Sequence, residues 1–381
     1  MGFIKQFIRH PQQLWVRRAN FQVHLWAGLI LVLYSILIGV SGSILVFGAE
    51  LERLFNPSPW RSISLKGPIA DLDTVITNVA VSYPQTHIIS VTAPTLEEPV
   101  FRAAMQRAAR ITVVCDPSTG RVLGAAPERR RSSLRWIYDL HENLLAGRTG
   151  RVVNAIAAGA LLLLACTGLV NWWPGLQSWK RALKVDFRRR WKRVNYDLHS
   201  AVGFWCLGLI VIWALSGIYF TWPDKAFALV DGLSRVTSTR APAVRVDPNS
   251  DRERLSYTSM ISKASALAPT KQWKDIIFPI SRMSPFEIVL SPVSSVGREK
   301  EETVYFNPYN GGYMSTWHYG DNKTLGDWII WLQVPLHFGT HWGLAFKCLW
   351  AALGLALPIL AMTGLLMYWN RFLSKRWPVS R

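Results

Sequence analysis

The sequence predicts an α-helical membrane protein with four transmembrane helices in two repeated hairpin units, each carrying an α+β domain outside the membrane. Half of the 381 residues are hydrophobic, which is typical of membrane proteins rather than soluble ones. Four apolar runs are each long enough to cross a bilayer, because about 20 helical residues span about 30 Å of hydrocarbon. Matching motifs recur at constant offsets along the chain, which indicates an internal duplication.

The four apolar runs are residues 25–48, 152–173, 200–222 and 348–369. The first is too long for the core of a signal peptide and lacks a small-residue cleavage site, so we interpret it as a retained anchor. In the first half we expect a cytoplasmic N-terminus with the first helix (1–48), an outside domain (49–135) and the second helix with an outside extension (136–174). A basic cytoplasmic loop (175–198) then leads to the second half. There we expect the third helix (199–223), a second outside domain (224–327), and the fourth helix with an outside extension and a cytoplasmic tail (328–381).

Basic residues determine this expected orientation. Clusters of Lys and Arg precede the first run, fill the loop between the second and third, and follow the fourth. Such segments stay in the cytoplasm, so both termini are expected inside, at the inner membrane of a Gram-negative bacterium, with the long connections in the periplasm. We therefore attribute the net charge of +19 to membrane topology and contact with lipid, not to nucleic-acid binding.

Each long connection has the same expected order of elements. Short amphipathic helices, residues 72–81 and 257–267, precede β-rich segments that end in a hairpin. Asp116-Pro117 to Gly120 and Asn307-Pro308 to Gly311 are typical turn sequences. Each copy is too small to bury a large core alone, so we expect the copies to pack on the membrane helices or on each other.

Two histidines occupy matched places near the cytoplasmic ends of the first and third helices. His24 and His199 are each preceded by an asparagine four residues earlier, and each is followed one turn later by a glycine, Gly28 or Gly203. Positions i and i+4 share a helix face, so the glycine leaves room for a flat macrocycle. Two imidazoles at one depth on parallel helices are suited to ligate one b-type haem.

Two further histidines, His141 and His337, open the second and fourth runs. Arg151 and Lys347 each follow ten residues later, which is about 15 Å of helix. If these cations mark the lipid interface, both imidazoles stand beyond it on extended helix, where a second haem would face water and an external substrate. We expect the two cations to extend toward headgroups, with haem propionates as alternative partners.

The outer ligand set has an open alternative. His341 lies one turn after His337 on the same expected helix face, so it is a second candidate ligand, or a partner of a propionate or substrate. Its counterpart in the first unit is Leu145, which favours His337. A metal site without porphyrin would need carboxylates; only Asp139 and Glu142 are nearby, and neither has a counterpart beside His337.

The sequence holds no nucleotide, nicotinamide or flavin fingerprint. No Cys-x-x-Cys-His occurs, which excludes covalent c-type haem. If the protein moves electrons, they come from a separate donor, either a quinol in the bilayer or a cytoplasmic reductase. Haem carries one electron at a time, which suits reduction of ferric to ferrous iron.

These motifs resemble the PepSY-associated transmembrane family of bacterial inner-membrane proteins. The similar stretches cover all four runs and include His24-Leu-Trp-Ala-Gly-Leu29, Leu140-His-Glu-Asn-Leu-Leu-Ala-Gly147, Thr167-Gly-Leu-Val-Asn-Trp-Trp-Pro174, Leu336-His-Phe-Gly339 and Thr363-Gly-Leu-Leu-Met-Tyr-Trp-Asn-Arg371. The outside modules resemble PepSY domains. Within the family, the chain is most similar to the FoxB-type ferrisiderophore reductases.

The resemblance implies two haem b groups, held by His24, His199, His141 and His337, that carry electrons across the membrane. It implies that the substrate is a ferric siderophore of the hydroxamate class, such as ferrioxamine, in the periplasm. Reduction would release ferrous iron. The alternatives are a PepSY-domain regulator of a periplasmic protease and a transporter of siderophore or iron.

Overall fold

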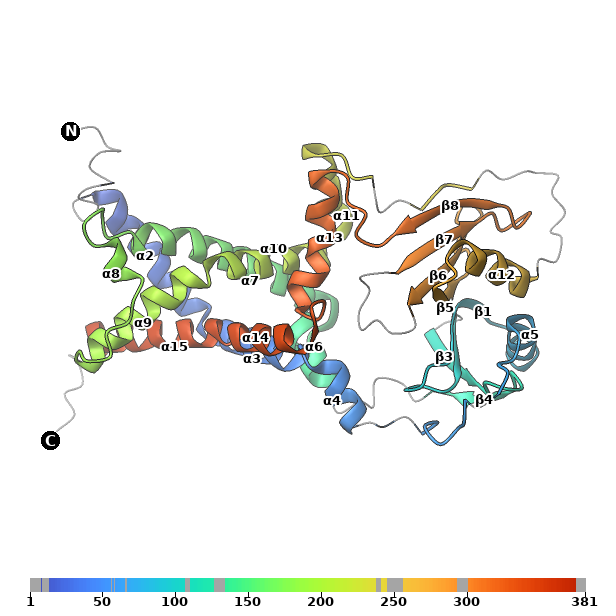
Figure 1. The fold of residues 1–381 in the computed structure, drawn as a ribbon. Coiled ribbons are helices and arrows are strands. Elements are labelled where there is room, and N and C mark those ends of the chain that lie inside the picture. Colours follow the sequence, from blue (N-terminus) through green and yellow to red (C-terminus); the bar gives the residue numbers. More distant parts are fainter. Residues whose placement is uncertain are drawn as a thin grey trace. The chain divides into compact units, whose positions relative to one another are not determined.

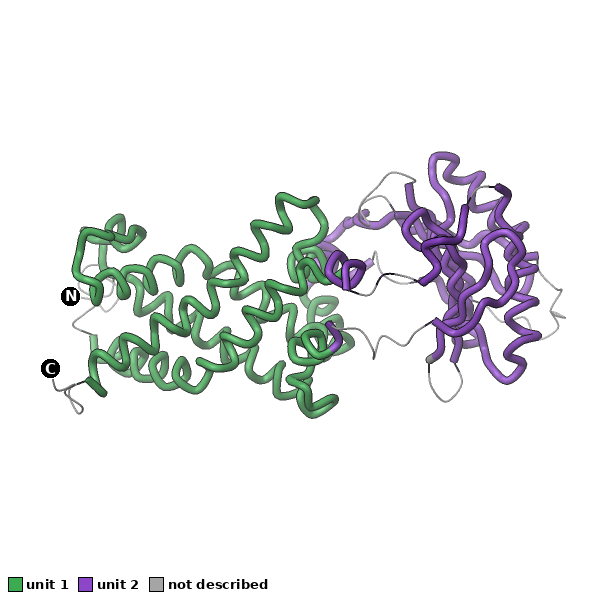
Figure 2. The backbone as a smooth tube through the Cα atoms, turned by 90° about the horizontal axis from the view of Figure 1, so that it is seen from below, with its two compact units in different colours: residues 1–49, 136–233, 332–381 green, residues 50–135, 234–331 purple. Residues whose placement is uncertain are grey.

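The computed structural model describes residues 8, 14–55, 57, 59–65, 67–106, 110–126, 134–237, 241–244, 256–292 and 301–374. Residues 1–7 and 375–381 at the two termini, for which we predict a cytoplasmic location, lie outside the described residues. The chain forms two compact units, each assembled from segments far apart in sequence (Figure 2). Unit 1 contains residues 1–49, 136–233 and 332–381, and unit 2 contains residues 50–135 and 234–331.

Unit 1 is a bundle of helices (Figure 1). Its long elements are α2 (Trp15–Ile30), α3 (Val32–Leu45), α7 (Gly147–Trp172), α9 (Trp191–Trp205), α10 (Leu207–Thr221), α14 (Gly343–Gly354), α15 (Ala356–Tyr368) and the π-helix η3 (Trp369–Leu373). Within the described residues, α7 and the segment Gly343–Leu373 are long and apolar enough to cross a membrane. The count rises to four if α2 with α3, and α9 with α10, each form one bent span.

The two bent pairs have the same local cause. Leu31, between α2 and α3, has φ −91° and ψ 3°, and Cys206, between α9 and α10, has φ −92° and ψ 0°. These values leave the helical range at a single residue, and the helices meet there at 61° and 60°. Both residues are buried in the bundle core. The expected first and third helices are therefore each divided in two.

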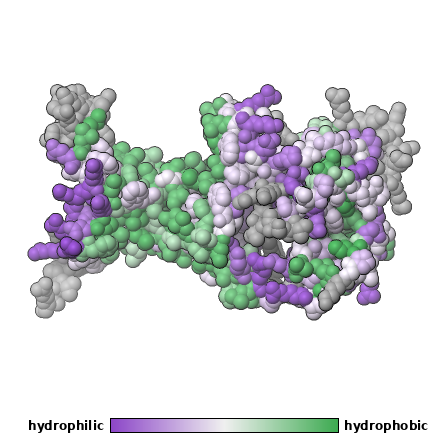
Figure 3. Space-filling view, in the orientation of Figure 1, coloured by the Kyte–Doolittle hydropathy of each residue, from purple (hydrophilic) through white to green (hydrophobic). Residues whose placement is uncertain are grey.

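The surface of unit 1 suits a lipid environment. Its core contains several small side chains, including Ala158, Ala165 and Ala214, which let membrane helices approach closely. Hydrophobic side chains cover the middle of the bundle, whereas hydrophilic ones cover the end that holds α8 (Trp179–Ala182) (Figure 3). The start of α2 and the end of α15 lie at this same end (Figure 1). An apolar belt beside a basic end is the pattern of a membrane-embedded bundle.

The expected outward extensions of the second and fourth helices are wrong. His141 lies on a separate helix, α6 (Arg135–Asn143), and the chain then reverses through Leu144 and Leu145, whose φ values are +52° and +62°. His337 lies on α13 (Leu325–Phe338), which ends before Gly339, with φ +64°. A left-handed residue ends a helix, so each outer histidine belongs to its own helix ahead of the span.

The described part of unit 2 contains one antiparallel sheet with the helices α5 (Leu72–Ser82) and α12 (Tyr257–Leu267), together with most of α4 (Gly48–Phe55) and the first part of α13. The sheet has the order β4-β3-β2-β1-β5-β6-β7-β8. Its strands are β1 (His87–Thr92), β2 (Phe101–Gln106), β3 (Arg110–Cys115), β4 (Val122–Ala125), β5 (Lys271–Ile277), β6 (Phe286–Pro292), β7 (Glu302–Phe306) and β8 (Tyr313–His318). The predicted helices are confirmed as α5 (Leu72–Ser82) and α12 (Tyr257–Leu267), and the predicted hairpins as β3–β4 and β7–β8.

The two modules that we expect outside the membrane form a single unit instead of two separate domains. β1 pairs with β5 in the middle of the sheet, with Val91 opposite Ile276. Asp73 on α5 accepts hydrogen bonds from the backbone N–H groups of Tyr257 (2.9 Å) and Thr258 (3.0 Å), and so caps the N-terminus of α12. One hydrophobic core contains residues from both modules. The expectation that the copies pack on each other is thus confirmed.

Two further helices complete the description. α4 (Gly48–Phe55) follows α3, and α11 (Pro223–Leu233) follows α10. Each comes directly after a bent pair, which places it where the chain leaves the apolar part of the bundle. α4 is amphipathic in sequence, with Glu50, Glu52 and Arg53 among its eight residues.

Candidate functional site

The four predicted histidines form two facing pairs within unit 1. The rings of His24 on α2 and His199 on α9 have centroids 6.3 Å apart and planes 87° apart. The rings of His141 on α6 and His337 on α13 have centroids 6.1 Å apart and planes 65° apart. We call these the inner pair and the outer pair.

The separation within each pair fits one metal ion between the rings. A ring nitrogen lies about 1.1 Å from the ring centre and a metal–imidazole bond is about 2 Å long, so two rings on opposite sides of one metal have centroids about 6.2 Å apart. Both observed separations agree with this value. Each pair can therefore supply two axial ligands to one metal.

The donor set favours a metal that brings its own equatorial ligands. Among the described residues, no group of three His, Cys, Asp or Glu side chains is placed to hold a metal ion. Two imidazoles leave most positions around a transition metal unfilled. A porphyrin fills four of them with its own nitrogens, so the pairs fit haem better than a metal without porphyrin.

Each imidazole is anchored by a hydroxyl group on another helix. The Nδ1 atom lies 2.7–3.0 Å from a serine or threonine oxygen in all four cases. The partners are Thr167 for His24, Thr363 for His199, Ser41 for His141 and Ser216 for His337. These contacts join α2 to α7, α9 to α15, α6 to α3 and α13 to α10.

The hydroxyl groups also determine which ring nitrogen carries the proton. Each one lies 2.6–2.7 Å from the carbonyl oxygen four residues earlier in its own helix. A hydroxyl has one proton to donate, so it donates to that carbonyl and its oxygen accepts from Nδ1–H. Nε2 then keeps its lone pair, and this is the tautomer that binds a metal through Nε2.

The imidazole rings of the outer pair, which the hydroxyl groups orient, are also uncharged. Burial lowers the pKa of His141 to about 4. Burial, together with the neighbouring His141, lowers the pKa of His337 to about 3. Both rings are therefore uncharged at neutral pH, which is the form required of a ligand.

Glycines lie against three of the four rings. A Cβ atom on Gly168 would stand 3.2 Å from His24 Cε1, one on Gly364 3.3 Å from His199 Cε1, and one on Gly42 2.9 Å from His141 Cε1. In the sequence these glycines belong to repeated Thr-Gly and Ser-Gly pairs, a pattern that by itself indicates close packing of membrane helices. These pairs recur at the same offsets as the histidines, and that recurrence could have predicted that their hydroxyl groups and glycines lie beside the imidazoles.

Gly28 and Gly203, which the sequence singled out, lie in ordinary helix contacts. An added Cβ would be 3.9 Å from Leu164 Cδ2 at Gly28, and 3.6 Å from Leu360 Cδ2 at Gly203. Each glycine therefore faces the helix that carries the hydroxyl partner of its histidine. Their role in making room for a macrocycle stays a prediction.

The asparagines that precede the inner histidines also act in parallel. Asn20 Nδ2 donates to the Thr167 carbonyl oxygen at 2.9 Å, and Asn195 Nδ2 donates to the Thr363 carbonyl oxygen at 2.9 Å. Each threonine thus accepts two hydrogen bonds, one from a histidine at its hydroxyl oxygen and one from an asparagine at its backbone carbonyl oxygen. Two anchors one turn apart fix the rotation of α2 on α7 and of α9 on α15.

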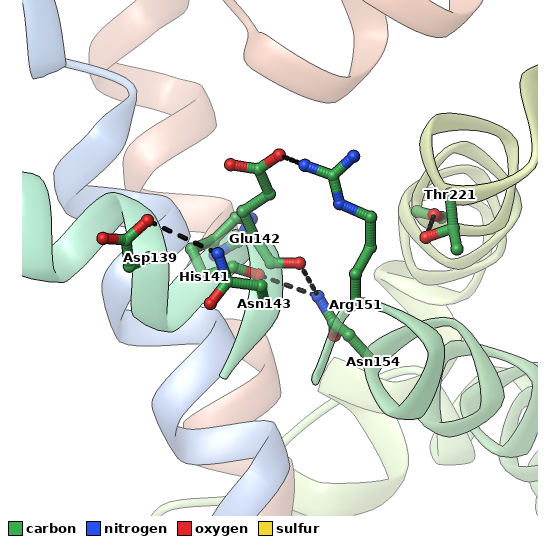
Figure 4. A network of polar contacts seen from close by, with 8 residues as sticks. Asp139, His141, Glu142, Asn143, Arg151, Asn154 and Thr221 are labelled. Carbon is green, nitrogen blue, oxygen red and sulfur yellow. Dashed lines mark hydrogen bonds and ion pairs between the residues drawn. The ribbon is translucent and has the colours of Figure 1, made fainter. Parts of the chain in front are cut away.

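Arg151 and Lys347 have different surroundings. Arg151 forms an ion pair with Glu142, the residue after His141 (Figure 4). In the same view Asn154 Nδ2 donates to the carbonyl oxygens of His141 (2.8 Å) and Glu142 (3.1 Å), and so caps the end of α6. Lys347 is only 9% exposed, with Nζ 5.2 Å from the centre of the Phe47 ring. The expectation that Lys347 extends to headgroups is therefore wrong.

His341 is not on the helix face of His337. α13 ends at Phe338, and His341 lies in the connection to α14, where it is buried. The prediction of a shared face requires one helix that continues past Gly339 to His341. The positive φ of Gly339 ends the helix before His341. The ring that faces His141 is that of His337.

The fold and the site define a membrane protein that combines a helical bundle, a sheet unit and two facing pairs of histidines. The sequence model of the family described as PepSY-associated TM region matches residues 21–371. The chain belongs to this family. A comparison with curated proteins finds no match.

Proposed function

We propose that the chain is an inner-membrane electron-transfer protein that holds two haem b groups. It reduces a ferric siderophore of the hydroxamate class in the periplasm and so releases ferrous iron. The observation that carries the proposal is the geometry of the two histidine pairs, with centroids 6.3 and 6.1 Å apart and every Nδ1 atom on a hydroxyl.

The histidines have assigned roles in this proposal. His24 and His199 hold the inner haem, and His141 and His337 hold the outer one. Haem, when bound, supplies a centre that accepts and donates one electron at a time. The four hydroxyls keep each Nε2 free of a proton.

The placement of the two pairs supports electron transfer across the apolar layer. His24 lies on α2 and Ser41, the partner of His141, lies on α3. Seventeen residues (41 − 24) separate them, which is about 25 Å of straight helix before the bend shortens it. This is comparable to the roughly 30 Å of hydrocarbon in a bilayer. The donor on the inner side is a quinol or a cytoplasmic reductase.

The substrate class follows from chemistry and from the resemblance to ferrisiderophore reductases. Ferric iron is a hard ion that hydroxamate oxygens hold tightly, whereas ferrous iron binds such ligands poorly. Delivery of a single electron therefore releases the metal without breaking a covalent bond. No protein group needs to act as an acid or a nucleophile in that step.

An optical spectrum with haem quantitation tests the proposal. The purified protein should be red, with two haems per chain and a Soret band that shifts on reduction by dithionite. Oxidation of the reduced protein by ferrioxamine, with ferrous iron trapped by a coloured chelator, should follow. A colourless protein would indicate a PepSY-domain regulator. Iron accumulation in proteoliposomes without any reductant would indicate a transporter.

The hydroxyl anchors give a specific prediction. Thr167→Val keeps the shape of the side chain but leaves His24 Nδ1 without its acceptor. We expect haem affinity at the inner pair to fall by about 10- to 100-fold, as for other outer-shell partners of histidine ligands. The dissociation rate of haem into excess apomyoglobin measures the change.

Thr221→Val is the matched control for this measurement. Its hydroxyl donates to the Gly217 carbonyl oxygen at 3.1 Å in the same manner, but it does not contact a histidine ring. Thr167→Ser, which retains the hydroxyl, should restore most of the affinity. Equal dissociation rates for the Thr167→Val and Thr221→Val proteins would show that the hydroxyl does not orient a ligand.

A further inference from the structure

Two buried hydrogen-bond donors near the inner pair have no partner among the residues that the structure describes. They are Asn171 Nδ2 and Trp173 Nε1, at the C-terminal end of α7. Leaving a buried donor unpaired is costly, and nearly all such groups in folded proteins have partners. Two of them so close in sequence indicate a missing acceptor.

Asn171 is tied directly to the histidine anchors. It lies one turn after Thr167, and its Oδ1 accepts a hydrogen bond from Asn20 Nδ2 at 2.9 Å. Asn20 Nδ2 also donates to the Thr167 carbonyl oxygen at 2.9 Å, so both of its protons are used. Asn171 must therefore present its oxygen to Asn20 and its NH₂ group elsewhere, so the amide orientation is determined by the network.

A positive charge lies beside the two donors. Arg17 Nη1 donates to the Trp173 carbonyl oxygen at 2.8 Å, and Nη2 donates to the Asn171 carbonyl oxygen at 2.6 Å. The guanidinium thus sits at the C-terminus of α7, where a cation is favoured. Two neutral donors next to a cation form a site for an anionic oxygen.

The second half of the molecule differs at this place. At the offsets of 175 and 196 residues that relate the histidines, Asn20 corresponds to Asn195 and Thr167 to Thr363, but Asn171 corresponds to Met367 and Arg17 to Lys192. The ring anchors are thus common to both halves, and Trp173 corresponds to Trp369, which is 46% exposed. Among the described residues, the unpaired buried donors at this place occur in the first half, and the Asn171 amide has no counterpart in the second. The two histidine ligands of one haem would come from the two halves, whereas both propionates lie on one edge of a haem, so a propionate site need not be repeated in the second half.

We propose that Asn171, Trp173 and Arg17 bind a propionate carboxylate of the haem held between His24 and His199. The proposal rests on the proposed function. Asn171 lies one turn after Thr167 and Trp173 follows at the end of α7, toward the hydrophilic end of unit 1, where the carboxylate edge of a haem belongs. A quinone carbonyl is the other acceptor that could use these donors, and the experiment separates the two.

Asn171→Met is the informative variant, because it installs the residue that stands at the corresponding place in the second half. In the full-length protein, we expect the inner haem to dissociate about tenfold faster, since a charge-assisted hydrogen bond is lost. We also expect its midpoint potential to become more dependent on pH between pH 6 and 8. Removing donors to the carboxylate raises the pKa of the propionate, so its protonation couples to reduction.

Two further variants keep the test decisive. Trp173→Phe removes one N–H group and retains an aromatic ring, so it serves if Asn171→Met fails to fold. Asn370→Met is the control, because Asn370 Nδ2 donates to the Leu366 carbonyl oxygen of its own helix (2.7 Å) in an exposed hydrogen bond. It should change neither the dissociation rate nor the potential. Comparison with His199→Ala protein identifies which spectral component is the inner haem.

The outcomes are distinguishable. Two haems with unchanged dissociation and unchanged pH dependence in Asn171→Met and Trp173→Phe would overturn the propionate assignment and leave the proposed function intact. Unchanged haem properties with a raised KM for quinol would assign the donors to a quinone and also overturn it. A protein that binds no haem would instead overturn the proposed function.

Discussion

Replacing His337 or His141 by alanine is expected to remove the outer haem and abolish reduction of ferric chelates, leaving one haem per chain. The two rings face each other at 6.1 Å between centroids, and one imidazole alone leaves a coordination position open. The pyridine haemochrome assay should give one haem instead of two. Trapping of ferrous iron should fall to the level without protein, because the inner haem has no route to the periplasmic substrate.

His341→Ala provides the decisive comparison for the outer pair. His341 is buried in the connection after α13 and is not the ring that faces His141. We expect this variant to keep two haems. Loss of the outer haem in His341→Ala, with retention in His337→Ala, would show that the ligand is His341. His87→Ala, at an exposed position of β1, controls for a nonspecific effect of losing a histidine.

Replacing His24 or His199 by alanine should have the complementary effect. The inner haem is lost and the outer haem stays, because the inner histidines are anchored by Thr167 and Thr363 and the outer ones by Ser41 and Ser216. Reduction by a natural donor from the inner side should stop. Dithionite, which reduces the outer haem directly, should still support ferric-chelate reduction.

Haem content and donor dependence together test the inner assignment. Each variant is quantified by the haemochrome assay and then assayed with quinol and with dithionite. Two haems in His24→Ala and in His199→Ala would refute the inner pair. Loss of both haems in a protein that still elutes as a single species would show that the two sites are not independent.

Much of the architecture was predictable because the chain repeats its signals. Helices α5 and α12 and the hairpins after β3 and β7 lie where amphipathic and turn patterns placed them. The pairing of His24 with His199 and of His141 with His337 was predicted from their constant offsets and expected sides. A repeated polar residue in an apolar run is informative because burial in lipid is costly without a function.

Other features of the fold could not be predicted from the residue types around them. Leu31 and Cys206 bend their helices without proline, since the departure from helical ψ occurs at one buried residue whose type does not reveal it. The reversal after His141 uses two leucines at positive φ, a conformation that leucine sequences do not predict. The hydroxyl anchors were missed because a small residue in a membrane helix has packing as its usual explanation.

The pairing of β1 with β5 imposes an order on biosynthesis. β1 ends at Thr92, but its partner strand is complete only when residue 277 has been made. Residues 136–233 of the bundle are translated in between. Until then the edge of β1 is unpaired and open to aggregation or proteolysis. A substitution that slows insertion of the bundle would therefore lower the yield of the protein by damaging the sheet, even though the substituted residue lies in the membrane.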